Sequence, residues 1–157
     1  MTRSLQSELV QKTPFEHPEV ELFLSLVRAT DALCRQPSQI LKKAGLSGPQ
    51  YNVLRILRGA GAAGLPCGDI GARMVTHDSD ITRLLNRLES KKWVKRAKKS
   101  NDRRCITTHI TATGLALLKS LDEPITQTHL HQLGFLPENE MHKILDCLAR
   151  IREHLSA

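Results

Sequence analysis

The apolar residues of this chain change their spacing at Trp93, and this change constrains the fold more than any other feature. Before Trp93 they recur every three or four positions, as on one face of a helix, and after it they alternate for a short stretch. The alternation predicts two strands, 94–97 and 106–110, joined by the charged turn KKSND. We therefore expect a mainly α-helical chain that contains one small β-hairpin.

The same hairpin region holds most of the positive charge. Residues 76–104 contain ten Lys and Arg against four Asp and Glu, a balance of +6, while the whole chain carries +7. Runs of like charge are often disordered tails. Trp93 and Val94 lie inside this run, and large apolar residues of this kind are not typical of a disordered tail. Charge concentrated on a folded element favours a polyanionic partner.

Helices are predicted on the N-terminal side of the hairpin, after a loose polar arm at residues 1–17. One helix begins near Glu19, and Pro37 is expected to end it. Another begins after Ser47, which is a suitable N-cap. Residues 59–64, GAGAAG, would then form a flexible connector.

Two short helical patterns follow, the first from Pro66, and only a few residues separate them. Thr76 or His77 would cap the second helix, and Asp78 and Asp80 would lie favourably at the positive end of its dipole. Two short helices joined by a tight turn are typical of a helix-turn-helix motif.

The second helix of this motif has an apolar face and a polar face. Four apolar residues from Ile81 to Leu88 follow the i, i+3, i+4, i+7 spacing of a buried stripe. On the polar face, arginine can bond guanine, asparagine can bond adenine, and hydroxyl groups can hold phosphates. An ordinary amphipathic helix is the alternative, but the tight turn before it and the basic hairpin after it favour DNA. The candidate DNA-binding residues of this helix are Ser79, Thr82, Arg83, Asn86 and Arg87.

The basic hairpin would form a wing beside this helix. Its cations would follow the phosphate backbone, because each neutralised phosphate releases a counterion. An arginine at the tip could enter the minor groove, and Asp102 could orient it through a charge-assisted hydrogen bond. The candidate DNA-binding residues of the hairpin are Lys95, Lys98, Lys99, Asp102, Arg103 and Arg104.

Two amphipathic helices are predicted after the hairpin, one capped by Thr111 and one that begins after Pro137. With the first helix they carry more apolar surface than one small winged helix can cover. Pairing across a two-fold axis would bury this surface; the alternative is that these helices only complete the core of a monomer. The expected division of the chain is a polar arm at 1–17, a winged-helix DNA-binding lobe at 46–111, and a helical dimerisation region at 18–45 and 112–157.

Three motifs in the central part of the chain match the pattern of a known family: D-x-R at Asp102 and Arg104, T-x-x-G at Thr111 and Gly114, and TRL-x-x-RLE at 82–89. On these motifs, residues 46–118 resemble the MarR family of winged-helix transcriptional regulators. The resemblance implies a homodimer that binds palindromic operators, usually represses transcription, and releases DNA when it senses a small ligand or an oxidant. It also implies that Arg104 is the minor-groove arginine and Asp102 its brace.

The sequence departs from the family's pattern at two places. Asp78 and Asp80 stand where basic or hydroxyl residues are common, and Cys67-Gly68 replaces a polar pair at the start of the preceding helix. Acids beside phosphates weaken binding unless they accept from cytosine or support Arg83. The alternative function is therefore a winged-helix module that binds another protein and no DNA.

The resemblance also implies a small-molecule pocket between the dimerisation helices and the winged-helix lobe. The candidate ligand-binding residues are Arg28, Leu33, Tyr51 and Leu115.

The cysteines and histidines indicate neither a disulfide framework nor a metal site. No two histidines have i, i+4 spacing, so we expect no metal and no cofactor. We expect buried, inert thiols, although a thiol- or metal-responsive sensor remains an alternative. Cys105, beside the wing arginines, is expected to be the most exposed of the four cysteines. These cysteines, more than thirty residues apart, are Cys34, Cys67, Cys105 and Cys147.

Several other function classes find no support in the sequence. It contains no Gly-rich phosphate loop, no nucleophile elbow and no cluster of acids in an apolar setting, so we expect no enzyme activity. An apolar run of membrane-spanning length and a secretory signal are also absent. We therefore expect a cytoplasmic, dimeric repressor with double-stranded DNA and a small ligand as partners, and no membrane.

Overall fold

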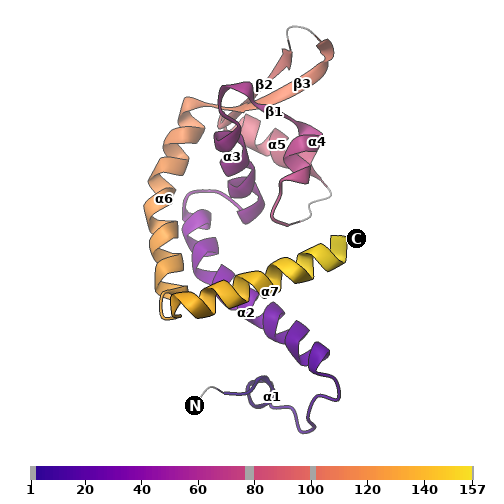
Figure 1. The fold of residues 1–157 in the computed structure, drawn as a ribbon. Coiled ribbons are helices and arrows are strands. Elements are labelled where there is room, and N and C mark those ends of the chain that lie inside the picture. Colours follow the sequence, from indigo (N-terminus) through magenta and orange to yellow (C-terminus); the bar gives the residue numbers. More distant parts are fainter. Residues whose placement is uncertain (1–2, 77–79, 100–101, 157) are drawn as a thin grey trace.

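The computed structural model describes residues 3–76, 80–99 and 102–156, and of residues 99 and 102–105 it describes the backbone alone. Helices dominate, and a three-stranded antiparallel sheet in the order β1-β3-β2 lies at one end of the molecule (Figure 1). The predicted class, mainly α with a small β-hairpin wing, is confirmed. In chain order the elements are α1 (Leu5–Glu8), α2 (Pro18–Lys43), α3 (Gly48–Ala60), the 3-10 helix η1 (Gly61–Ala63), β1 (Leu65–Pro66), α4 (Cys67–Ala72), α5 (Ile81–Ser90), β2 (Val94–Lys99), β3 (Asp102–Ile110), α6 (Ala112–Leu133) and α7 (Glu138–Ser156).

Helix α2 does not end at Pro37, so that prediction is wrong. Proline has no N–H, and Pro37 therefore leaves the carbonyl of Leu33 without its partner in the helix. The side chain of Gln132, on α6, fills this gap: its Nε2 donates to the Leu33 oxygen at 3.1 Å. With that carbonyl satisfied from another helix, α2 continues to Lys43.

The glycine-rich segment 59–64 is not a loose connector, which corrects another expectation. Helix α3 continues to Ala60, η1 follows, and β1 then pairs with β3 opposite Thr107 and Thr108. Gly64 has a φ of +60°, and a Cβ there would lie 2.6 Å from the Thr108 carbonyl oxygen. A glycine is required at this position because the backbone approaches so closely.

The hydrophobic core lies in the lobe formed by α3, α4, α5, the sheet and α6 as far as Ile125, and Leu41 near the end of α2 joins it. Helix α3 starts with a capping box, in which Ser47 accepts from the Gln50 N–H, so the predicted Ser47 cap is confirmed. From the lobe, α6 leads to the far end of the molecule, where α7 crosses α2 (Figure 1). The most deeply buried apolar side chains are Val53, Leu54, Leu57, Ile70, Leu85, Leu88, Val94 and Leu118.

Candidate nucleic-acid interface

Helix α5, the second helix of the helix-turn-helix, begins at Ile81 because Asp80 caps it. One carboxylate oxygen of Asp80 accepts from the Arg83 backbone N–H at 2.9 Å. A carboxylate here also interacts favourably with the positive end of the helix dipole. The predicted cap at Thr76 or His77 is therefore wrong. The cap also explains why an acid stands at Asp80, where basic or hydroxyl residues are common in the family. Residues 77–79, which include Asp78 and the candidate Ser79, lie outside the described residues.

The polar face of α5 is open to solvent. Leu84, Leu85 and Leu88 are buried against the lobe. Because α5 packs on α4 and α3 through this apolar face, its other side is free for a groove. Whether those side chains read bases stays a prediction. The four described candidates on the open face, all exposed, are Thr82, Arg83, Asn86 and Arg87.

The wing is longer than expected. Strands β2 and β3 pair from Val94 opposite Ile110 to Lys99 opposite Asp102, with an irregularity between Lys98 and Lys99. The predicted five-residue turn KKSND is therefore wrong, because backbone pairing continues into the charged residues. The hairpin projects from the lobe near α5 at the end of the molecule (Figure 1).

Two of the wing candidates have described side chains. Lys95 and Lys98 are both exposed on β2. The predicted roles of the others stay predictions, since the structure places their backbone in the strands and does not describe their side chains. These others are Lys99, Asp102, Arg103 and Arg104.

The base of the wing is fixed to the start of α6, as Thr111 and Gly114 of the T-x-x-G motif make clear. Thr111 caps α6, as predicted, by accepting from the Gly114 N–H at 3.1 Å. Its hydroxyl also lies 2.7 Å from the carbonyl oxygen of Lys92 and 3.1 Å from that of Trp93. A Cβ at Gly114 would collide with the Trp93 carbonyl. Val94, only 2 % exposed, anchors the first strand in the core.

Lys91 is bound to the protein itself. Its Nζ donates to the Gly45 carbonyl at 2.7 Å and lies 4.6 Å from the centroid of the Trp93 ring. The lysine thereby links the end of α5 to the turn that follows α2. The sequence places Lys91 in the basic run, and no spacing rule indicates its partner 46 residues away.

Arg96 of β2 likewise bonds to α5. Its Nη2 donates to Oδ1 of Asn86 at 2.7 Å, and its Nη1 lies 3.4 Å from a carboxylate oxygen of Glu89. Sequence reasoning included Arg96 only among the hairpin cations expected to follow the phosphate backbone, and it predicted no contact between Arg96 and Glu89. Seven residues separate them across the turn between helix and strand, and neither helical nor strand periodicity pairs such positions.

The predicted ligand residues do not share one cavity in the protomer. Tyr51 lines a hollow of about 500 Å³ between α3, α6 and the start of α7. Arg28 instead pairs with Glu8 of α1 at 2.7 Å and lines a separate hollow of about 310 Å³. Leu33 and Leu115 are not among the residues that line either hollow.

The larger of these hollows has a charged wall. Arg58 of α3 donates two hydrogen bonds, of 2.8 and 2.9 Å, to the carboxylate of Asp122 on α6. These bonds raise the pKa of Arg58 above its ordinary value, although burial acts in the opposite direction. The guanidinium of Arg55 lies 5.8 Å from the Tyr51 ring centroid. Apolar side chains such as Leu133 and Met141 complete the lining.

Three thiols differ from expectation. Cys34, Cys67 and Cys147 are exposed rather than buried, because they lie on the outer faces of helices, and the side chain of Cys105 is not described. Among the side chains that the structure describes, no three His, Cys, Asp or Glu come together as a metal site requires. None of the described helices is long and apolar enough to cross a bilayer.

Comparison with known proteins decides the family. A family model described as MarR family matches residues 46–106. The structure of a MarR transcription factor from Planctomyces limnophilus is 35% identical, with a TM-score of 0.66, over 87% of this chain and 98% of that one. The chain belongs to the MarR family. It is a DNA-binding transcriptional regulator with a winged helix-turn-helix.

Two further relatives agree with membership of the MarR family. The HTH-type transcriptional regulator PecS of Dickeya dadantii (strain 3937) is 29% identical over 163 residues, which cover 99% of this chain and 98% of PecS. The structure of NadR in complex with 4-hydroxyphenylacetate is 27% identical, with a TM-score of 0.68, and the match covers 90% of this chain and 97% of NadR.

Proposed function

We propose that this MarR-family protein is a homodimeric repressor that binds a palindromic operator and releases it when a small molecule binds. The observation that carries the proposal is the side-by-side placement of the open polar face of α5 and the basic wing. In the complex, α5 would lie in the major groove and the hairpin would lie along the neighbouring phosphates. Because its target is chromosomal DNA, we place the protein in the cytoplasm.

Some side chains would contact bases and others would contact the phosphate backbone. Arg83 would read a base, because its exposed guanidinium can bond guanine O6 and N7 together. Thr82 and Arg87, on the flanks of the same face, would position the helix on phosphates. Lys95 and Lys98 would hold the backbone beside the wing. Ser79, Lys99, Asp102, Arg103 and Arg104 are assigned from the sequence alone, with Arg104 in the minor groove.

The dimer would form through the helices at the far end of the molecule. Helix α7 buries none of its residues in the protomer, and large apolar side chains of α2 and α7 face solvent. Phe23 is 64 % exposed and Leu145 is 60 % exposed. Apolar patches of this extent mark interaction surfaces, and pairing across a two-fold axis would place two α5 helices about 34–36 Å apart, one turn of DNA.

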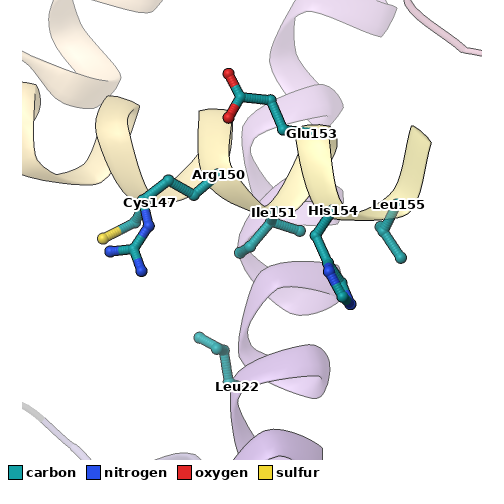
Figure 2. A pocket seen from close by; sticks show the side chains of 7 residues that line it. All are labelled: Leu22, Cys147, Arg150, Ile151, Glu153, His154 and Leu155. Atoms are coloured by element: carbon teal, nitrogen blue, oxygen red, sulfur yellow. The ribbon is translucent and has the colours of Figure 1, made fainter. Parts of the chain in front are cut away.

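The ends of α2 and α7 support the same dimer. Leu22 of α2 and Ile151 and Leu155 of α7 line an open hollow of about 700 Å³, and the side chains of Leu22 and Ile151 point toward one another (Figure 2). Polar and charged side chains of α7 share the wall of this hollow: Cys147, Arg150, Glu153 and His154. A helix of a second protomer could fill the hollow and meet both the apolar and the polar side chains. This arrangement supports the proposed division into a lobe at 46–111 and a dimerisation region at 18–45 and 112–157.

The ligand would bind in the hollow of about 500 Å³ beside Tyr51. This hollow has a size suited to a small molecule, and it lies between the winged-helix lobe and the helices that would form the dimer. Arg55 offers a cation and Tyr51 an aromatic ring in its wall. A ligand here would change how α3 sits on α6, and so the position of both α5 helices.

A binding assay with salt titration tests the proposal. We expect the protein to select a palindrome from random duplex DNA, and its affinity to fall steeply as salt rises. Arg83→Ala should relax the preference at one base position per half-site and cost about 1–3 kcal/mol on the selected operator. Selection of no sequence at low salt would refute operator binding and favour the protein-interaction alternative.

A further inference from the structure

The hydrogen bond between Asn86 of α5 and Arg96 of β2 constrains what Asn86 can recognise. Nη2 of Arg96 and Oδ1 of Asn86 are 2.7 Å apart. A guanidinium has donors and no acceptor, so only the amide oxygen of asparagine can face it. The orientation of the Asn86 amide is therefore fixed by chemistry, with its NH₂ group turned away from Arg96.

Arg96 is itself held in place by α5. Glu89 accepts from the Arg96 backbone N–H at 3.2 Å, and its second oxygen lies 3.4 Å from Nη1. Nη2 also lies 3.5 Å from the carbonyl oxygen of Thr82. The Arg96 side chain is only 28 % exposed. A guanidinium with these contacts to one helix is poorly placed to serve as a phosphate contact.

An asparagine in this orientation differs from the usual adenine reader. To bond adenine at two points, its oxygen must accept from the N6 amino group while its NH₂ donates to N7. Because the oxygen of Asn86 already accepts from a charged donor and is turned toward Arg96, the NH₂ is the group of this side chain that is better placed to contact a base in the groove. The NH₂ donor matches both acceptors of guanine, N7 and O6, and thymine O4. On adenine it matches N7 alone, because the neighbouring N6 amino group is itself a donor.

We propose that Arg96 is a specificity-determining residue that acts by positioning Asn86. It holds Asn86 as a hydrogen-bond donor and so turns the preference at the contacted base away from adenine and toward guanine or thymine. The inference rests on the proposed function, since it requires α5 to lie in the major groove. It also revises the adenine preference that asparagine alone would suggest.

Operator selection from random duplex DNA tests the proposal, with the full-length protein and its Arg96→Met and Asn86→Ala variants. The position whose preference disappears in Asn86→Ala is the one that Asn86 reads. There, the unaltered protein should favour guanine or thymine over adenine by about tenfold. Arg96→Met frees the amide oxygen. At that position alone, adenine should then be selected at least as often as guanine or thymine.

Two further variants separate positioning from a direct contact. In the Asn86→Ala background, Arg96→Met should change no base preference, because Arg96 acts through Asn86. Arg96→Lys keeps a donor for the amide oxygen and should retain the guanine or thymine preference. If Arg96→Met fails to fold, Asn86→Asp takes its place: it keeps the acceptor for Arg96, removes the donor, and should abolish that preference.

Several results would overturn the inference. The unaltered protein could prefer adenine at the position that Asn86 reads, or Asn86→Asp could keep the original preference. Arg96→Met could also weaken binding to all sequences alike and lower the salt dependence with base preferences unchanged, which would make Arg96 a phosphate contact. A protein that selects no sequence from the pool would instead refute the proposed function.

Discussion

At the scale of single residues, the Lys and Arg side chains around the wing form two groups, those bonded within the protein and those exposed to solvent. In the sequence they appear as one continuous basic run. Lys91 and Arg96 are bonded to backbone and side-chain oxygens of the protein. Lys95 and Lys98 are exposed on β2 and, by our proposal, serve DNA. Charge density therefore indicates the region that we propose binds DNA, but it does not say which of its cations are free to do so.

Lys91→Met tests this division. The substitution removes the bond to the Gly45 carbonyl and the cation over Trp93, so it should lower the free energy of unfolding by about 1 kcal/mol. Urea denaturation at fixed protein concentration measures the change. Lys95→Met is the matched control and should stay within about 0.5 kcal/mol of the unaltered protein. Equal denaturation midpoints for the two variants would contradict the division.

The limits of sequence reasoning at this scale follow from how side chains find partners. The exposed face of α5 could be predicted, because helical periodicity alone decides which residues face the core. The cap at Asp80 could not be separated from caps at Thr76 or His77, since each has a suitable side chain. The bonds of Lys91 and Arg96 depend on how distant elements pack.

At the scale of elements, α5 ends in a motif that usually contains glycine. Lys92 has a φ of +59°, its N–H bonds the Glu89 carbonyl at 2.8 Å, and the Trp93 N–H bonds the Leu88 carbonyl at 3.0 Å. This is the Schellman arrangement, in which a left-handed residue follows the helix. A side chain in that conformation costs about 1–2 kcal/mol.

Lys92→Gly should therefore stabilise the protein. Glycine relieves the left-handed strain but has more freedom in the unfolded chain, so the net gain should be about 0.5–1 kcal/mol. A rise in the thermal midpoint would show it. Ser90→Gly, inside the last turn of α5, is the control and should lower stability by about 0.5–1 kcal/mol. A loss of stability in Lys92→Gly would contradict this account of the helix end.

The passage of α2 through Pro37 gives a second prediction at this scale. Pro37→Ala restores an N–H for the Leu33 carbonyl, so that carbonyl would no longer depend on Gln132. In a double-mutant cycle, Gln132→Met should cost about 1 kcal/mol more in the presence of Pro37 than in the Pro37→Ala background. Urea denaturation measures these changes in the free energy of unfolding. If the effects of the two substitutions simply add, the hydrogen bond from Gln132 does not compensate for Pro37.

Elements defined by strong local patterns could be predicted, and those that depend on tertiary contacts could not. The hairpin, α5 and the two C-terminal helices follow from periodicity and caps. Strand β1 has only two residues, and it exists because β3 offers an edge at Thr107 and Thr108. Likewise, α2 passes Pro37 because a side chain from α6 replaces the missing hydrogen bond.

At the scale of the whole molecule, the two ends of the protein differ in how well they are packed. The lobe buries a continuous core, whereas α7 leaves its apolar stripe exposed in the protomer. Amphipathic spacing in the sequence was enough to predict this surplus. The residues around the hollow beside Tyr51 could not be predicted, since they depend on how α3 meets α6 and α7.

Leu145→Lys tests the proposed dimer. A charge in the middle of the exposed apolar stripe of α7 should prevent pairing, because a buried, unpaired lysine is costly. Light scattering after gel filtration should give twice the 17.6 kDa chain mass for the unaltered protein and a single chain mass for the variant. Asn139→Lys, on the opposite face of α7 by helical spacing, should remain dimeric. A monomeric unaltered protein would refute the dimer.

The most direct test of the central claim, that the wing and α5 together bind DNA, is the salt dependence of operator affinity. Fluorescence anisotropy would compare the unaltered protein with Lys98→Ala on the operator and on unrelated duplex DNA. We predict that Lys98→Ala weakens both alike and flattens the slope of log affinity against log salt by about one unit for each phosphate that is no longer neutralised. Lys91→Met should leave that slope unchanged. An unaltered slope in Lys98→Ala would contradict the assignment of the wing to DNA.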